Sequence, residues 1–292
     1  MEYAIVVEDM HKSYGNVKAV NGIAFRVKKG ELFVMVGPNG AGKTTTIEIC
    51  EGLRDFDEGK VSILGKEPTD MELKKHIGVQ LQEGGFPEMI KVEEILELFS
   101  SLYGNPAEPD YVLKELGLID KKKEYYSKLS GGLKQRVAIA AALVVNPDIL
   151  FLDELTTGLD PQARRATWEF IKEIKKLGKT IFLTTHYMEE AEILGDRIMI
   201  IDQGEIVALD TPANLIRQYG GISKVTYMGK PVEIKTSKRI EQVGEEITVY
   251  TDDVEKTLTE ITQKSPGVLK NIRIEKPNLE DVYISLTGKE IK

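Results

Sequence analysis

The most regular feature of the chain is an alternation of short apolar runs with segments of helical period. The runs ELFVMVG (31–37), DILFLDE (148–154) and TIFLTTH (180–186) have strand length and polar or turn residues at their ends, as expected of strands buried on both faces. Between the last two runs the period is helical and ends at Gly178. The apolar positions of that helix are Ala163, Ala166, Phe170, Ile174 and Leu177. This order predicts an α/β fold whose sheet has a largely parallel centre covered by helices.

Two regions depart from the alternation. Between about Lys91 and Val145 the pattern is helical, which predicts helices at 91–104 and 110–118. The first of these helices places on one face Val92, Ile95, Leu96, Phe99 and Leu102. From about Gly221 we expect short strands at 224–228, 231–236, 246–251 and 269–276, with helices at 253–264 and 278–288. The sequence therefore predicts a first domain of residues 1–220, with a helical subdomain at about 88–145, and a small C-terminal α+β domain of residues 221–292.

Composition excludes several classes of protein. The 292 residues carry a net charge of −8, which argues against broad attraction to nucleic acid. Cys50 is the only cysteine, so we expect no internal disulfide and a reducing setting, with Cys50 as a small apolar filler. The N-terminus lacks the apolar region of a secretory signal. The longest apolar run, 137–145, is shorter than the roughly 20 residues that span a bilayer, and we expect no transmembrane segment.

The stretch GPNGAGKT, at 37–44, matches the P-loop pattern G-x-x-x-x-G-K-[ST] between a predicted strand and a predicted helix. Such a loop turns backbone N–H groups toward phosphates, and Lys43 extends to the terminal phosphates while Thr44 offers its hydroxyl to Mg²⁺. The alternative is a glycine-rich turn with a surface lysine, which the strand and helix on either side disfavour. The predicted phosphate-binding residues are Gly37, Pro38, Asn39, Gly40, Ala41, Gly42, Lys43, Thr44 and Thr45.

A second candidate lies at the end of ILFLDE, where Asp153 and Glu154 follow an apolar strand. Adjacent strand residues point to opposite faces, so we expect the two carboxylates to have different roles. One would hold the water shell of Mg²⁺ and the other would align and deprotonate an attacking water. The alternative is an acidic pair that caps the following turn.

Together, GPNGAGKTT, LSGGLKQRVAIAAAL, ILFLDELTTGLDP and TTHYMEEAE resemble the ATP-binding subunit of an ABC transporter, over about Ala4 to Gly220. The resemblance implies a P-loop NTPase fold, in which a RecA-like core carries an antiparallel β subdomain and a helical insert. It also implies ATP hydrolysis with Mg²⁺, in which Asp153 binds the metal and Glu154 is the general base.

The resemblance assigns roles to further residues. Tyr14 stacks on adenine, and Gln82 contacts Mg²⁺ or the attacking water, with Gln80 as a competing candidate. His186 touches the γ-phosphate and helps to hold Glu154 in line. Asp160 reaches across a dimer interface, although by itself it would be interpreted as an Asp-Pro turn.

The motif LSGG raises a separate question, because it is a second phosphate-binding pattern in a chain that already has a P-loop. In the family that it resembles, Ser130, Gly131 and Gly132 cover the ATP held by another subunit, which implies a head-to-tail homodimer. Leu133 and Leu155 stand where many members have glutamine and proline. These departures remove one polar contact and loosen one turn.

The same resemblance implies a cytoplasmic subunit on the inner face of the membrane, working with two membrane permease subunits. NLEDVYISLTG and IGVQLQEGG look like the drug-efflux branch, similar to daunorubicin-resistance proteins, with partners of ABC-2 type. The alternatives are a soluble ABC ATPase acting on ribosomes or DNA, an importer motor with a regulatory C-terminal domain, and a module that senses ATP without turnover. The soluble ATPases carry a long coiled coil or a second ATPase domain, and neither pattern is seen.

Overall fold

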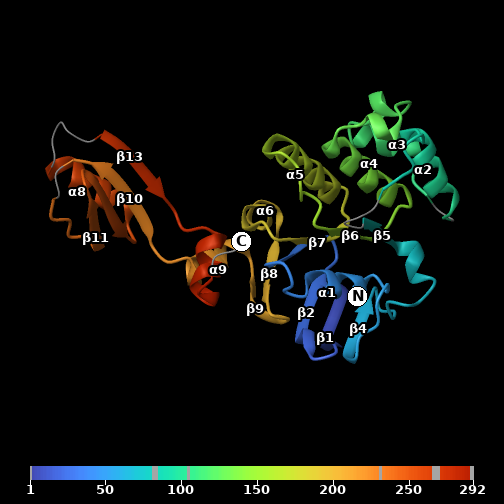
Figure 1. Cartoon of the computed structure of the whole chain (residues 1–292), viewed down its shortest axis with the longest axis horizontal. Coiled ribbons are helices and arrows are strands. Elements are labelled where there is room, and N and C mark those ends of the chain that lie inside the picture. The colour runs from blue at the N-terminus through green and yellow to red at the C-terminus, as the bar shows by residue number, and fades with distance from the viewer. Residues whose placement is uncertain (1, 81–84, 104–105, 230–231, 265–269, 290–292) are drawn as a thin grey trace. The chain divides into compact units, whose positions relative to one another are not determined.

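A computed structural model describes residues 2–80, 85–103, 106–229, 232–264 and 270–289. The contacts within the chain divide it into an N-terminal unit, residues 1–212, and a C-terminal unit, residues 213–290. Figure 1 shows the elements of both units. In the part of the chain that the structure describes, no helix is both long and apolar enough to cross a membrane.

The N-terminal unit is organised around a six-stranded sheet of order β5-β6-β7-β3-β8-β9. Its strands are β3 (Leu32–Val36), β5 (Ile77–Gln80), β6 (Ile149–Asp153), β7 (Thr180–Thr185), β8 (Arg197–Asp202) and β9 (Glu205–Asp210). Neighbours from β5 to β8 are parallel, and only β9 runs antiparallel. Every residue of β3, β6 and β7 is buried, because helices or a second sheet cover both faces. The predicted α/β sheet with a parallel centre is therefore confirmed.

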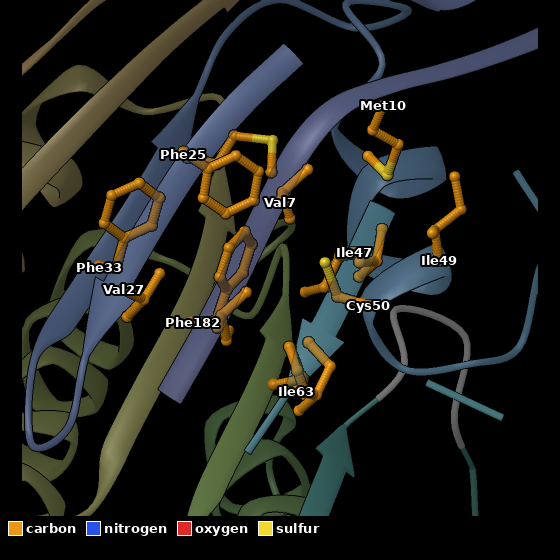
Figure 2. Close-up of a cluster of buried hydrophobic side chains, with 14 of the residues drawn as sticks. Val7, Met10, Phe25, Val27, Phe33, Ile47, Ile49, Cys50, Ile63 and Phe182 are labelled. Carbon is orange, nitrogen blue, oxygen red and sulfur yellow. The ribbon is translucent and has the colours of Figure 1, made fainter. Parts of the chain in front are cut away.

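A second, antiparallel sheet of order β2-β1-β4 lies beside the first. It consists of β1 (Tyr3–Tyr14), β2 (Val17–Lys28) and β4 (Glu58–Ile63). Its inner face shares a core with the central sheet and with α1 (Lys43–Cys50), as Figure 2 shows. Phe25, Phe33 and Phe182 come from three strands of the two sheets and have ring centroids 5.5 to 5.9 Å apart. Cys50 is fully buried in this core, as predicted for an apolar filler.

The other helices of this unit lie against the central sheet or pack on one another. They are α2 (Val92–Ser101), α3 (Pro109–Glu115), α4 (Gly131–Val144), α5 (Pro161–Lys176) and α6 (Met188–Leu194), with short 3₁₀ turns at Leu73–His76, Ile119–Lys121 and Tyr126–Lys128. Helix α4 contacts β5, α6 contacts β3 and β7, and α2 and α3 pack on α4. Two predicted core positions are wrong. Leu102 and Leu177 are 67% and 43% exposed, because α2 ends at Ser101 and α5 ends at Lys176.

The C-terminal unit contains an antiparallel sheet of order β11-β12-β10-β13. Its elements are α7 (Pro212–Tyr219), β10 (Ser223–Met228), β11 (Ser237–Val243), β12 (Glu246–Thr251), α8 (Val254–Lys264), β13 (Lys270–Glu275) and α9 (Leu279–Thr287). Ile261 of α8 packs against the buried strand residues Val225 and Val249. Asn278 begins α9 by accepting hydrogen bonds from the amides of Glu280 and Asp281.

One predicted strand of this unit is misplaced. The expected strand at 231–236 is absent from its described residues, and the sheet instead uses β11. Ile234 is buried in the core, and its carbonyl accepts hydrogen bonds from the amide and the hydroxyl of Ser237. This turn ends the apolar run. The following strand is largely exposed and rich in charged residues, so it lacks a clear strand pattern.

Candidate functional site

The P-loop connects β3 to α1 and depends on glycine at two positions. A Cβ atom at Gly37 would lie 2.2 Å from the carbonyl oxygen of Ile201, and one at Gly42 would lie 2.3 Å from that of Ala19. Gly42 also has a φ of 101°, in the left-handed region that favours glycine. Only glycine fits these two positions, and the chain can therefore turn tightly between strand and helix.

The outer part of the loop faces solvent. Asn39 and Gly40 are exposed, Pro38 is half-buried, and Ala41 is buried beneath them. Thr44 is exposed and Thr45 is half-buried at the start of α1. The start of a helix presents free N–H groups and the positive end of the helix dipole. The arrangement is that of an anion-binding loop.

Lys43 lies at the centre of the site and is 4% exposed. Its Nζ atom donates hydrogen bonds to the carbonyl oxygens of Gly37 and Pro38, at 2.9 and 3.1 Å. The same atom lies 3.1 Å from Glu154 Oε1. The structure therefore brings the P-loop lysine and the acidic residue after β6 into one buried ion pair.

Glu154 has an unusual backbone conformation, with a φ of 45°. A non-glycine residue in this left-handed region carries strain of about 1–3 kcal/mol. Its amide is held by the carbonyl oxygen of Thr184 at 3.1 Å and lies 3.2 Å from the hydroxyl of the same residue. Oε2 accepts a 3.4 Å hydrogen bond from the Thr157 hydroxyl. The residue with the strained backbone is thus also the one whose carboxylate contacts both Lys43 and Thr157.

Asp153, the last residue of β6, is also buried, and its carboxylate accepts a hydrogen bond from the Thr184 hydroxyl. Burial raises the pKa of Asp153, the Thr184 hydrogen bond opposes this rise, and the negative charge of Glu154 adds to it. The different roles predicted for the two carboxylates stay a prediction. Strand β6 ends at Asp153 and Glu154 turns into the left-handed region, and the charges of both Glu154 and Lys43 act on the Asp153 carboxyl.

His186 follows β7 and lies beside Glu154. Its Nδ1 atom is 3.4 Å from Glu154 Oε2, and its side chain is 20% exposed. The imidazole centroid is 4.0 Å from that of the Tyr187 ring. Three predicted residues from three parts of the chain, Lys43, Glu154 and His186, therefore meet at one site.

Tyr14 lies at the tip of the β1–β2 hairpin and is 42% exposed. Its hydroxyl accepts a 2.6 Å hydrogen bond from Arg54 Nη1, and Arg54 Nε in turn donates to Glu48 at 2.6 Å. Sequence patterns do not indicate Arg54, because it lies far from Tyr14 along the chain and no motif contains both residues.

The LSGG motif, residues 129–132, which we call the signature segment, has a different environment from the P-loop. Ser130 and Gly131 are exposed, and Ser130 Oγ accepts a 3.4 Å hydrogen bond from the Leu133 amide at the start of α4. A Cβ atom at Gly132 would lie 3.2 Å from Ala163 Cβ, so the helix packs closely on α5. Gln135 Nε2 donates a 2.7 Å hydrogen bond to the carbonyl oxygen of Leu155, a link between this helix and the segment after Glu154 that sequence patterns did not indicate.

The remaining predicted residues have simpler environments. Asp160 is exposed and caps α5, because its Oδ1 atom accepts hydrogen bonds from the amides of Gln162 and Ala163, both at 2.9 Å. Gln82 lies outside the described residues. Gln80, the competing candidate, is buried at the end of β5.

The residues present fit Mg²⁺ together with a nucleotide. No group of three or more His, Cys, Asp or Glu residues suited to a metal ion occurs among the residues described. Magnesium in nucleotide sites uses one or two protein oxygens and completes its shell with phosphates and water. The Asp153 carboxylate is a suitable oxygen ligand, and its burial favours a cation nearby.

Taken together, the parallel sheet, the P-loop and the acidic residues after β6 define a P-loop nucleotide hydrolase. A family described as "ABC transporter" matches residues 20–157. The chain is 38% identical to Nod factor export ATP-binding protein I of Rhizobium etli, over 99% of this chain and 95% of that protein. It is 35% identical to linearmycin resistance ATP-binding protein LnrL of Bacillus subtilis, over 98% of both.

Solved structures agree. The ATP-binding subunit of an ABC transporter matches with 31% identity and a TM-score of 0.64, over 74% of this chain and 93% of that one. A dimeric bacterial ABC transporter cassette, MJ0796, matches with 27% identity and a TM-score of 0.63, over 71% and 98%. The chain belongs to the ATP-binding proteins of ABC transporters, and it is an ATPase of that family. The predicted family and fold class are confirmed.

Proposed function

We propose that this chain is the ATP-hydrolysing motor subunit of an ABC exporter. The observation that carries the proposal is the meeting of Lys43, Glu154 and His186 beside the P-loop. Transfer of a phosphoryl group to water needs a cation for the phosphates and a base for the water, held in a fixed geometry. These three side chains supply those groups.

In this proposal the P-loop amides and Lys43 bind the phosphates of ATP, and Tyr14 stacks on the adenine. Asp153, Thr44 and Gln82 would hold Mg²⁺. When bound, Mg²⁺ neutralises part of the phosphate charge. The exposure of Asn39, Gly40 and Thr44 leaves this side of the loop open to a ligand.

Glu154 acts as the general base. Its Oε1 atom is paired with Lys43 and its Oε2 atom faces His186. A γ-phosphate competes with Glu154 for Lys43, since one ammonium group serves both anions. Arrival of the phosphate therefore frees Oε1 to accept a proton from water, while His186 holds the carboxylate in place. In this way substrate binding prepares its own base.

The signature segment contacts the nucleotide of a second copy of the chain, in a head-to-tail homodimer. The exposure of Ser130 and Gly131 at the start of α4 supports this assignment, because a helix start attracts phosphate. Asp160 lies at the start of the adjacent α5 and is exposed as well. The related dimeric cassette adds further support.

The exporter assignment rests on the relatives, which are named for export and for resistance. We propose that the homodimer works on the cytoplasmic face of the membrane with two permease subunits of ABC-2 type, as in the drug-efflux branch. These names favour export over import, and over a soluble role on ribosomes or DNA.

The decisive experiment replaces Glu154 with glutamine, which keeps the shape of the side chain but removes the base. Glu154→Gln should bind ATP, accumulate as an ATP-bound dimer and lose about 10²- to 10⁴-fold in hydrolysis rate. Glu173→Gln on the exposed side of α5 is the matched control and should hydrolyse ATP normally. Near-normal hydrolysis by Glu154→Gln would remove the assignment of the base.

A second measurement tests the transport role. The chain should co-purify with membrane subunits. In membrane vesicles, the complex should move substrate away from the compartment that contains the chain and ATP. ATP-dependent transport toward that compartment would point to an importer. Stable association with ribosomes or DNA in place of membrane subunits would favour a soluble ATPase.

A further inference from the structure

Glu190 is a fully buried acidic residue that the proposed chemistry does not use. It lies on α6, with an exposed fraction of 0%. Its Oε1 atom accepts a 2.8 Å hydrogen bond from Trp168 Nε1 of α5. A carboxyl group is costly to bury unless neighbouring groups satisfy it, so the neighbours of Glu190 indicate what it contributes.

These neighbours belong to the two segments that carry the proposed catalytic residues. The hydroxyls of Thr185 and Thr156 lie near the Glu190 carboxyl and lower its pKa, although the Thr156 hydroxyl and Glu190 Oε2 make no hydrogen bond within the described residues. Thr185 directly precedes His186, and its Oγ1 atom accepts a 3.0 Å hydrogen bond from the Tyr187 amide, which follows His186. Thr156 lies two residues after Glu154 in the chain. One buried carboxyl group thus borders both segments.

A cation and two aromatic rings extend the cluster toward His186. The guanidinium carbon of Arg164 lies 4.7 Å from the Tyr187 ring centroid and 5.7 Å from that of Trp168. The charge of Arg164 also acts on the Glu190 carboxyl. Because the Tyr187 and His186 rings are in contact, with centroids 4.0 Å apart, a movement of this cluster changes the position of the imidazole.

We propose that Glu190 is a positioning residue that fixes the distance between Glu154 and His186. It joins α5 to the segment containing His186 and to the segment that follows Glu154, and it does not touch the nucleotide. The inference rests on the proposed roles of Glu154 and His186. It predicts a residue whose loss slows the chemical step without weakening the binding of ATP.

The contact that defines this role is the hydrogen bond that Glu190 Oε1 accepts from Trp168. Burial raises the pKa of Glu190, and the nearby hydroxyls of Thr185 and Thr156, the hydrogen bond from Trp168 and the charge of Arg164 only partly oppose that rise. A glutamine side chain also has an oxygen that can accept the hydrogen bond from Trp168 Nε1, so glutamine should replace Glu190 with little loss.

The test compares three variants by steady-state ATPase kinetics. Glu190→Met keeps the side-chain volume but removes the polar contacts. We expect kcat to fall about tenfold or more, because small displacements of catalytic groups lower the rate by up to about 10²-fold. KM should stay within about twofold of the parent. Glu190→Gln should retain kcat within about threefold. Glu189→Met, at the exposed neighbouring position on α6, is the matched control and should behave like the parent.

Trp168→Phe provides an independent test if Glu190→Met does not fold, as judged by its thermal melting. It removes the indole N–H that donates to Glu190 and keeps an aromatic ring, and kcat should fall about threefold or more with KM unchanged.

Unchanged kcat in a folded Glu190→Met or in Trp168→Phe would overturn the inference. A Glu190→Gln variant as slow as Glu190→Met would also overturn it. Failure of the Glu154→Gln experiment would instead count against the proposed function, so the two results are separable.

Discussion

The two glycine-rich helix starts of the N-terminal unit differ in how their polar groups are satisfied. At α1, Lys43 is buried and binds two loop carbonyls and the carboxylate of Glu154. At α4, Ser130 and Gly131 are exposed, and the serine hydroxyl is used within its own helix. The first site is assembled from several elements of one chain. The second presents its helix start to solvent, so any anion that it binds must come from outside.

Among the variants that test this comparison, the largest effect should follow from Lys43→Met, which removes the cation at the centre of the first site. We expect kcat/KM for ATP to fall about 10²- to 10³-fold, as for the loss of a transition-state donor. Melting temperature should also fall, because a buried carboxylate loses its partner. Lys172→Met on the surface of α5, whose partner Glu169 is exposed, should leave both quantities unchanged. Turnover by Lys43→Met within tenfold of the parent would argue against a role for Lys43 in binding the phosphates.

At the second site, Ser130→Ala should lower turnover about tenfold or more and weaken ATP-driven dimerisation, since hydrogen bonds to charged groups contribute about 1.5–3 kcal/mol. Binding of ATP to the isolated monomer should not change. Ser130→Thr keeps the hydroxyl and should recover most of the loss, while Ser127→Ala at a nearby exposed position is the control. Dimerisation by sedimentation that is unaffected in Ser130→Ala would contradict the contrast between the sites.

The buried region around α1 also predicts a pH effect that the exposed region does not. Burial, and then the charges of Asp153 and Glu48, raise the pKa of Glu51 from 4.5 to about 8. The folded protein therefore retains this proton to higher pH than the unfolded chain does. Stability contributed in this way is complete below pH 4.5 and is lost as pH rises to about 8.

Glu51→Gln removes the titrating group. Its melting temperature should therefore decline less than that of the parent between pH 5 and pH 8.5. At about 1.4 kcal/mol per pKa unit, the loss of unfolding free energy over this range should be smaller than in the parent by a few kcal/mol. Parallel melting curves against pH for the two proteins would exclude Glu51 as the cause. Glu67→Gln, at an exposed position, is the control.

The smallest effect concerns the edge of the first site. Tyr14→Phe removes the hydroxyl that accepts from Arg54 but keeps the ring, so ATP affinity should change less than about threefold. Tyr14→Ala removes the ring and should weaken ATP binding by about 1–3 kcal/mol, the typical contribution of a base stacked on an aromatic side chain. Calorimetric titration measures both. Equal affinities for Tyr14→Ala and the parent would remove Tyr14 from the nucleotide site.

Sequence alone predicted the residues Lys43, Glu154 and His186, which the structure brings together, because they lie in local motifs. The P-loop, β6 and β7 each carry their functional residues within a few positions of a buried strand, so strand and motif support one another. The predicted apolar faces of α2 and α5 were wrong at Leu102 and Leu177. Each residue lies just beyond the end of its helix, and the hydrophobic period does not show where a helix ends.

Other features depend on contacts that no local pattern encodes. Gln135, Glu190 and Arg54 each contact residues distant in the chain. Strand β11 was missed because its exposed, charged residues lack an apolar alternation. Tertiary position, rather than residue type or spacing, gives these residues their significance.

The hydrogen bond from Gln135 to the Leu155 carbonyl has a mechanical consequence. It attaches α4 to Leu155. The preceding residue, Glu154, already has a strained backbone. In the proposed dimer, a displacement of Ser130 caused by the nucleotide of the second copy would be transmitted through α4 to the Glu154 carboxylate of this chain. Hydrolysis at each of the two sites would then depend on whether the other site holds a nucleotide.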